Sequence, residues 1–87
     1  MYGLKLSDKV IETFHKMRRK NKKQLELINK KVLEIRENPT RFKPLSNVMK
    51  GLRRVHFGSF VLVYSIDEKN KVVKLEDYDH HDNIYRK

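Results

Sequence analysis

Hydrophobic side chains in the first 40 residues recur every three or four positions, which is the spacing of one face of an α-helix. The first such stripe predicts an amphipathic helix over residues 8–20, N-capped by Ser7, and consists of Val10, Ile11, Phe14 and Met17. The second predicts a helix that ends at Asn38, before Pro39, and consists of Leu25, Ile28, Val32 and Ile35. Because the junction between them is short, we expect an antiparallel helical hairpin.

The rest of the chain alternates between apolar and polar positions, which is the pattern of β-strands. Residues 2–6 form a short predicted edge strand, and residues 71–78 form a later one. Between them, residues 52–64 predict a hairpin whose strands are joined by Gly58-Ser59, a pair that suits a type II′ turn. One face of this hairpin, which we assign to the core, carries Val55, Phe57, Phe60, Leu62 and Tyr64. The other face carries Arg54, His56, Val61 and Val63.

The predicted elements follow in the order β-α-α-β-β-β, within a single domain of residues 1–87 that shows no internal repeat or linker. This order predicts an α+β fold, in which two N-terminal antiparallel helices pack on one face of a twisted antiparallel β-sheet. The opposite face of the sheet, with Arg54 and His56, would then be exposed to solvent.

The charge of the chain narrows the classes of partner. Lys and Arg number 21 against 11 Asp and Glu, which gives a net charge of +10. The excess lies in residues 1–60, with 16 basic and 5 acidic residues, whereas residues 61–87 hold 5 and 6. A positive field of this strength favours a polyanion, most commonly a nucleic acid. The alternative is a solvated Lys-rich surface of the kind found in thermophiles.

The composition also excludes several classes of protein. The chain has no cysteine, so no disulfide or thiolate metal site supports the fold, and a reducing compartment is expected. No apolar run approaches the roughly 20 residues of a membrane span, and the N-terminus lacks the apolar segment of a signal peptide. We therefore expect a soluble cytoplasmic protein that makes no membrane contact.

Ionisable side chains on the exposed face of the hairpin are candidates for chemistry on a phosphodiester. Arg54 and His56 are two positions apart on one strand, and the C-terminal segment brings His80, His81 and Tyr85 to the end of the neighbouring strand. Arginine stabilises the charge that develops on a phosphoryl group. Histidine and tyrosine transfer protons, and tyrosine also stacks on bases. The alternative is that His56 is an ordinary surface residue and that Tyr85 packs on the sheet.

The run Asp79-His80-His81-Asp82 contains ligand types that bind metal ions. Adjacent residues at the end of a strand point to opposite faces, so His80 and His81 would not share one ion. The other histidines are His15 and His56, far upstream in the sequence. We therefore expect no metal ion and no other cofactor.

Residues 54–64 and 80–85 carry the two segments that point to a family. The first is Arg-Val-His-Phe-Gly-Ser-Phe-Val-Leu-Val-Tyr, and the second is His-His-Asp-Asn-Ile-Tyr. They resemble the central hairpin, Arg-x-Arg-x-Gly-x-Tyr-Arg-x-x-Tyr, and the closing His-Arg-x-x-x-Tyr of the RelE/ParE superfamily of toxins from toxin–antitoxin modules. The second match has one fewer intervening residue. Members of that family place two N-terminal helices on a twisted antiparallel sheet.

The resemblance implies an endoribonuclease of the ribosomal A site, in which the 2′-hydroxyl of the mRNA attacks the adjacent phosphate and no metal ion is needed. Arg54 would stabilise the phosphate charge, His56 and His81 would be the acid–base candidates, and Tyr85 would stack on a base or transfer a proton. Three basic residues would hold the RNA backbone, namely Lys43, Lys50 and Arg53.

Two positions depart from the family pattern and leave alternatives open. Many members carry Arg where this chain has Val61 and His81, whereas some RelE-like ribonucleases rely on histidines, a role open here to His56 and His81. The alternatives are a ParE-like toxin that poisons DNA gyrase and a non-catalytic basic module that binds gyrase or RNA. As partners the resemblance implies an acidic, RelB-like antitoxin, the ribosome and mRNA.

Overall fold

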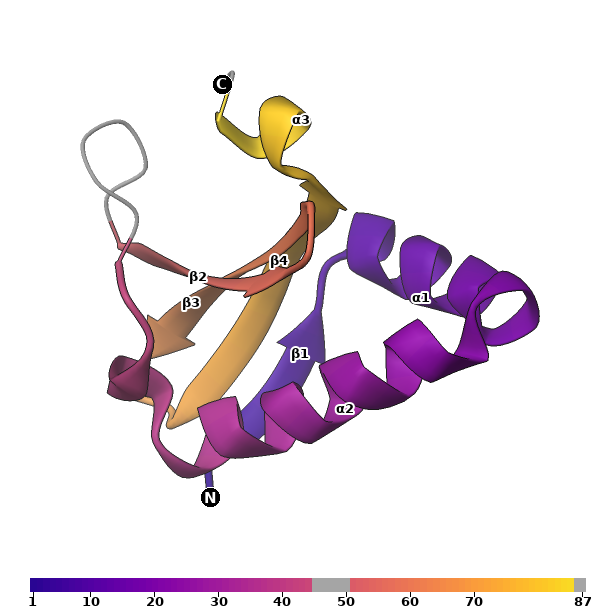
Figure 1. The fold of residues 1–87 in the computed structure, drawn as a ribbon. Coiled ribbons are helices and arrows are strands. Elements are labelled where there is room, and N and C mark those ends of the chain that lie inside the picture. The colour runs from indigo at the N-terminus through magenta and orange to yellow at the C-terminus, as the bar shows by residue number, and fades with distance from the viewer. Residues whose placement is uncertain (45–50, 86–87) are drawn as a thin grey trace.

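The structure is a computed structural model that describes residues 1–44 and 51–85. Its elements follow in the order β1 (Gly3–Leu6), α1 (Asp8–Lys20), α2 (Lys22–Glu37), the 3-10 helix η1 (Pro39–Arg41), β2 (Leu52–Phe57), β3 (Phe60–Asp67), β4 (Val72–His80) and α3 (His81–Tyr85). In Figure 1, α1 and α2 lie along one face of the curved sheet, and α3 follows the end of β4. The predicted α+β class is confirmed. None of the described helices has the length and apolar character needed to span a membrane.

Short polar residues define the ends of the two long helices. The Ser7 hydroxyl accepts a hydrogen bond from the Val10 N–H at 3.2 Å and caps α1, as the sequence predicts. Asn21 serves both helices: its backbone N–H donates to Met17 O at 2.9 Å, and its side-chain oxygen accepts from the Gln24 N–H at 3.2 Å. One asparagine therefore ends α1 and begins α2, which produces the predicted helical hairpin.

The sheet has the strand order β1-β4-β3-β2. Strand β3 pairs with β2 and β4 in antiparallel register, but β1 pairs with β4 in parallel, so the sheet is mixed and not wholly antiparallel as predicted. At the two ends of β1, the Gly3 N–H donates to Lys71 O at 2.8 Å and the Ser7 N–H donates to Leu75 O at 2.9 Å. Apolar–polar alternation is the same in parallel and antiparallel strands. The pattern therefore predicted that residues 2–6 form a strand, but not the direction in which this strand pairs.

The hairpin between β2 and β3 turns at Gly58-Ser59, with Phe57 opposite Phe60. Gly58 has a φ of 61°. Ser59 has no positive φ, since among the described non-glycine residues a positive φ occurs at Lys71. A type I′ turn would require a positive φ at Ser59 as well, so the turn matches the predicted type II′. This short turn sets the register of the two strands.

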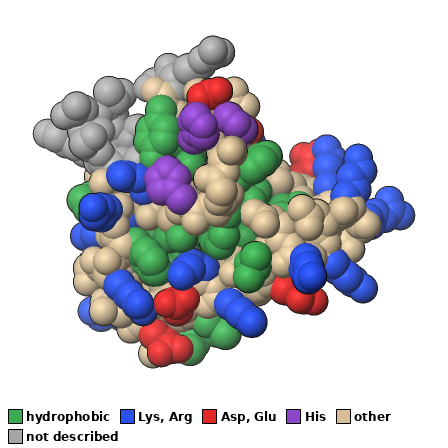
Figure 2. Space-filling view, viewed as in Figure 1, with side chains coloured by type: hydrophobic (Ala, Val, Ile, Leu, Met, Phe, Trp, Pro, Cys, Tyr) green, Lys and Arg blue, Asp and Glu red, His purple; other side chains and the backbone are tan. Residues whose placement is uncertain are grey.

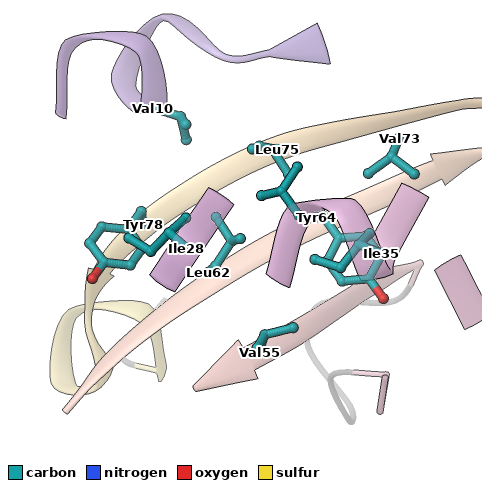
Figure 3. Close-up of a cluster of buried hydrophobic side chains, with 10 residues drawn as sticks. Val10, Ile28, Ile35, Val55, Leu62, Tyr64, Val73, Leu75 and Tyr78 are labelled. Carbon is teal, nitrogen blue, oxygen red and sulfur yellow. The ribbon is translucent and has the colours of Figure 1, made fainter. Parts of the chain in front are cut away.

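The main core lies between the helical hairpin and the sheet (Figure 3). Its buried side chains are Val10, Ile28, Val32, Ile35, Val55, Leu62, Tyr64, Val73, Leu75 and Tyr78. The predicted core face of the hairpin is confirmed at Val55, Leu62 and Tyr64, and Phe57 packs at the margin of this core. Phe60, at the tip of the hairpin, is 42% exposed. Burial of the core side chains therefore decreases toward the turn.

A second apolar cluster lies on the other face of the sheet. Val61 and Val63 are fully buried there beneath Ile84 of α3, with Leu52 at the margin. The prediction that this face is exposed is therefore wrong for its two valines. The cause is that α3 covers β3, and a strand that is buried on both faces carries a continuous apolar run in place of alternation.

Candidate active site

Arg54, His56 and Tyr85 meet on the face of the sheet that lies opposite α1 and α2, and we call this set the Arg54 cluster. Arg54 Nε donates to His56 Nε2 at 3.2 Å, and the Tyr85 hydroxyl lies 3.5 Å from that same nitrogen. The ring centroids of His56 and Tyr85 are 6.4 Å apart. Figure 2 shows histidine side chains gathered on one face of the molecule, next to hydrophobic side chains and with Lys or Arg side chains beside them. The fold thus brings together three of the four side chains that the sequence suggested for catalysis.

The hydrogen bond from Arg54 determines the state of the His56 ring. A guanidinium has N–H donors and no acceptor, so His56 Nε2 accepts and the ring proton lies on Nδ1. The imidazole is therefore neutral in this arrangement. Arg54 also donates from Nη1 to Pro44 O at 3.2 Å, which orients the guanidinium. A neutral imidazole beside a permanent positive charge and a hydroxyl is able to accept a proton next to a group that stabilises an oxyanion.

Helix α3 positions Tyr85. Its residue Ile84 is fully buried in the second apolar cluster, and the His81 N–H donates to Ser59 O at 2.8 Å, which ties the start of α3 to the hairpin turn. Tyr85, next to the anchored Ile84, is 47% exposed. This helix was not predicted from the sequence, because a segment of 5 residues is too short to display helical periodicity.

Asp79 organises the junction between β4 and α3. Its Oδ1 accepts hydrogen bonds from the His80 N–H at 2.7 Å and from Asn83 Nδ2 at 3.1 Å, and its Oδ2 pairs with Lys9 Nζ at 3.0 Å. The hydrogen bond from Asn83, followed by that from Lys9, lowers the pKa of Asp79 to about 2. Lys9 also pairs with Asp77 at 2.7 Å, and this bond raises the pKa of Lys9. Asp79 is a positioning residue, whereas the sequence pattern pointed to it only as a member of the candidate metal-binding run Asp79–Asp82.

The His81 side chain makes no hydrogen bond or ring contact with the Arg54 cluster among the residues that the structure describes. Its ring packs on His80, with centroids 4.4 Å apart, and its Nδ1 lies 3.0 Å from Asp82 Oδ1. The prediction that the two adjacent histidines point to opposite faces is wrong, because β4 ends at His80 and α3 begins at His81, so strand alternation stops there. His81 and Tyr85 are instead four residues apart in a helix and lie on one side of it.

The predicted RNA-binding residues differ in their surroundings. Lys43 is exposed, and its carbonyl oxygen accepts from the Arg54 N–H at 3.1 Å, so this part of the loop runs beside the edge strand β2. Arg53 points to the opposite face, where its Nη1 donates to Phe42 O at 2.7 Å and holds the loop against the sheet. Lys50 lies outside the described residues. Lys43 is therefore the predicted phosphate contact that the structure places beside the Arg54 cluster.

A groove of about 540 Å³ lies between the helices and the hairpin. Its lining includes Met17 of α1 and three aromatic residues on the helix side of the sheet, Phe57, Phe60 and Tyr78. None of the described lining residues belongs to the Arg54 cluster. The groove and the candidate active site are therefore separate surfaces.

The sequence matches a known family over almost its whole length. The family described as ParE toxin of type II toxin-antitoxin system, parDE, matches residues 4–85. An uncharacterized protein of Methanosarcina mazei is 55% identical over 86 residues, which cover 98% of this chain and 100% of the relative. A Methanocaldococcus jannaschii protein, named as the candidate toxin RelE4, is 42% identical over 88 residues, which cover 100% of this chain and 94% of the relative.

A solved structure shares the fold. The intact RelBE toxin–antitoxin complex of Escherichia coli contains a chain that superposes on this one with a TM-score of 0.78, covering 92% of this chain and 96% of that one. At 20% sequence identity this likeness concerns the fold alone. Family membership rests on the sequence matches, which extend through both β2 and α3. The chain belongs to the RelE/ParE superfamily of toxins from type II toxin–antitoxin systems.

Proposed function

We propose that the protein is a metal-independent endoribonuclease that cleaves mRNA on the ribosome as the toxin of a toxin–antitoxin module. The observation that carries the proposal is the Arg54 cluster, where a guanidinium and a tyrosine hydroxyl both lie within 3.5 Å of one imidazole nitrogen. A protein that only binds RNA or gyrase has no need for this combination of charge stabiliser and proton carriers at one point.

In the proposed reaction the 2′-hydroxyl of the RNA is the nucleophile. His56 Nε2 takes the proton of this hydroxyl as the 2′-oxygen bonds to the adjacent phosphorus. Arg54 turns its N–H groups to the non-bridging phosphate oxygens and stabilises their growing charge. The bond from phosphorus to the 5′-oxygen breaks as the Tyr85 hydroxyl protonates that oxygen, and the proton held by His56 Nε2 then passes to the Tyr85 oxygen, 3.5 Å away, which restores both groups. The products are a 2′,3′-cyclic phosphate and a free 5′-hydroxyl.

Residues around the Arg54 cluster would hold the RNA. Lys43 is exposed beside Arg54 and is suited to a neighbouring phosphate. His81 lies on the same side of α3 as Tyr85 and would contact the strand from there. Val61 is fully buried beneath α3, so the position where the family pattern has Arg does not face the substrate in this chain. The absence of an arginine at this position is therefore compatible with RNA cleavage by Arg54, His56 and Tyr85.

We also propose an acidic antitoxin as the protein's partner. A net charge of +10 favours a negatively charged protein surface as well as RNA, and complementary charge accelerates association. The RelBE complex, which shares this fold, pairs a toxin with its antitoxin. The expected inhibitor is encoded next to this chain and covers the Arg54 cluster or displaces α3. Production of this chain alone should be toxic, and co-production of the acidic neighbour should relieve that toxicity.

The deciding experiment incubates the purified protein with translating ribosomes and maps the mRNA ends. Codon-periodic cuts that leave 5′-hydroxyl ends support the proposal. Tyr85→Phe, which keeps the ring and removes the proton, should lower the cleavage rate by about 100-fold. Tyr2→Phe is the matched control, because Tyr2 contacts Glu68 at a distant edge of the sheet.

The second candidate function is poisoning of DNA gyrase, which the family description parDE favours. In that case the mRNA stays intact while DNA–gyrase cleavage complexes accumulate in the presence of the protein. The same protein preparation, added to gyrase and supercoiled plasmid, separates the two functions.

A further inference from the structure

A second group of ionisable side chains lies where β4 passes into α3. His80, His81 and Asp82 each offer one metal-ligand atom, and these atoms all lie within 4.8 Å of one another. Asp82 Oδ1 is 3.0 Å from His81 Nδ1, and Asp82 Oδ2 is 3.6 Å from His80 Nδ1. We call these three residues the His80 triad.

The spacing of the His80 triad matches that of ligands around one metal ion. Imidazole nitrogen and carboxylate oxygen bind Zn²⁺ at about 2.0–2.2 Å, so two ligands at the tetrahedral angle lie about 3.4 Å apart. Asp82 Oδ1 lies 3.0 Å from His81 Nδ1 and Asp82 Oδ2 lies 3.6 Å from His80 Nδ1, so each imidazole has one carboxylate oxygen near this distance, and one ligand atom from each of the three residues falls within 4.8 Å of the others. Little rearrangement is needed: the rings turn their lone pairs to one point, and the Asp82 N–H gives up its 3.2 Å contact with His80 Nδ1.

Two hydrogen bonds to the backbone hold the triad in place without using its imidazole or carboxylate groups. Asp79 Oδ1 accepts from the His80 N–H at 2.7 Å, and the His81 N–H donates to Ser59 O at 2.8 Å. The side chains themselves are open to solvent, with 38%, 47% and 61% of their surface exposed at His80, His81 and Asp82. An ion can therefore reach the triad and keep a water in its fourth position.

We propose that the His80 triad binds one divalent transition-metal ion of the Zn²⁺ class and that the bound ion inhibits RNA cleavage, a second step that rests on the proposed function. Two imidazoles and one carboxylate suit Zn²⁺, Cu²⁺ or Ni²⁺, whereas Mg²⁺ and Ca²⁺ prefer oxygen ligands. The ion occupies His81 and restrains the helix that carries Tyr85. The cleavage reaction itself uses no metal ion.

Binding is tested by isothermal titration of Zn²⁺ into the full chain, prepared without a histidine tag. The expected result is one saturable site, and Co²⁺ in place of Zn²⁺ should give the visible absorption of a four-coordinate ion. His80→Gln and Asp82→Asn each remove a direct ligand and should weaken Zn²⁺ binding by at least about 10-fold, the smallest loss that is typical even for a residue that only supports a ligand. His15→Gln, at an exposed histidine of α1, is the control and should bind as the wild type does. Lack of saturation at millimolar Zn²⁺, or equal binding by all variants, overturns the site.

The regulatory step is tested in the ribosome cleavage assay. His80 lies outside the proposed catalytic set, so His80→Gln should keep the basal cleavage rate. Zn²⁺ should inhibit the wild type and His15→Gln, a zinc-selective chelator should reverse this, and His80→Gln should resist. Equal inhibition of His80→Gln overturns the regulatory step. Zinc binding by a protein that never cleaves RNA overturns the proposed function and supports the site.

Discussion

At the residue scale, Arg54 connects three parts of the candidate site. Its guanidinium contacts His56 and the carbonyl oxygen of Pro44, while its backbone N–H donates to Lys43 O. These contacts lie at the surface and involve few apolar atoms. The side chain therefore contributes little to the stability of the fold, and its charge is available to a phosphate.

Arg54→Ala should leave the fold intact and lower the cleavage rate by about 100-fold, because a donor to the developing oxyanion is lost. Arg54→Lys should recover only part of the rate, since a single ammonium cannot reproduce the planar fork of the guanidinium. Rates come from the ribosome assay, and thermal unfolding monitors the fold. Arg18→Ala, at an exposed position of α1, is the control with the same change of charge. Full activity of Arg54→Ala would show that the wrong face of β2 has been assigned to chemistry.

Tyr64 is a titratable residue inside the main core. The side chain is fully buried, and its hydroxyl donates to Pro39 O at 2.6 Å. Burial raises the pKa of Tyr64 from 10.0 to about 12. The folded state therefore keeps this proton at pH values where the unfolded chain loses it. Its contribution to stability is complete below pH 10 and is lost as the pH rises to about 12.

The free energy of unfolding of the wild type should accordingly fall between pH 10 and about 12. Tyr64→Phe should lower the free energy of unfolding by about 1 kcal/mol at neutral pH, because the buried Pro39 carbonyl loses its hydrogen-bond donor. The same substitution should make the decrease in the free energy of unfolding at alkaline pH less steep. Part of the fall should persist, since burial also raises the pKa of Tyr78. Urea unfolding at several pH values measures both effects. The exposed Tyr85→Phe is the control, and an alkaline fall that is equally steep in Tyr64→Phe would refute this account.

At the element scale, α3 decides what the exposed face of the sheet becomes. Its 5 residues are too few to form a stable helix in isolation. The burial of Ile84 on β3, the hydrogen bond from the His81 N–H to Ser59 O and that from Asn83 Nδ2 to Asp79 Oδ1 hold it in place. The same short helix carries one member of the Arg54 cluster and two members of the His80 triad.

Ile84→Ala should release α3 while the main core remains folded. Removing a buried isoleucine side chain costs about 2–5 kcal/mol, which exceeds what the few remaining contacts of such a short helix supply. Amide hydrogen exchange should accelerate across residues 81–85 and stay slow in α1 and α2, and cleavage should fall to the level of Tyr85→Phe. Leu27→Ala, at a 53% exposed position of α2, is the control. Normal cleavage despite rapid exchange would show that α3 need not be docked for catalysis.

At the scale of the whole molecule, the positive charge is distributed unevenly between the segments. Residues 1–60, which include both long helices and β2, carry 16 basic and 5 acidic residues. Some of these charges form ion pairs on the surface, such as Arg41 with Glu34 at 3.0 Å. The exposed Lys43 beside the Arg54 cluster is placed differently, since a bound RNA strand would pass it.

Binding of single-stranded RNA should weaken with salt by about 0.7 log units per log unit of salt for each phosphate that is neutralised. Lys43→Gln and Lys50→Gln should each reduce this slope. Lys30→Gln, an exposed lysine of α2, removes the same charge elsewhere and should leave the slope unchanged. Fluorescence anisotropy of a labelled RNA over a range of salt concentrations provides the slopes. Equal slopes in all variants would return Lys43 and Lys50 to the ordinary solvated surface.

Local rules in the sequence predicted much of this molecule. Helical periodicity and the cap at Ser7 located α1 and α2, since both signals depend on residues close together in the chain. Gly58 predicted the tight turn for the same reason, and the turn then set the pairing of Phe57 with Phe60. Alternation along β2 predicted that Arg54 and His56 share one face, because side chains two positions apart in a strand point to the same side.

Tertiary structure alone decided the rest, because it depends on residues far apart in the sequence. The parallel pairing of β1 with β4 joins segments about 70 residues apart, and alternation is blind to direction. The burial of Val61 and Val63 depends on a helix too short to show periodicity, and that helix also turns His80 and His81 to the same side. The sequence by itself thus determined the two long helices, the strands and the family, and packing determined the short helix α3 and which side chains of β2 and α3 meet.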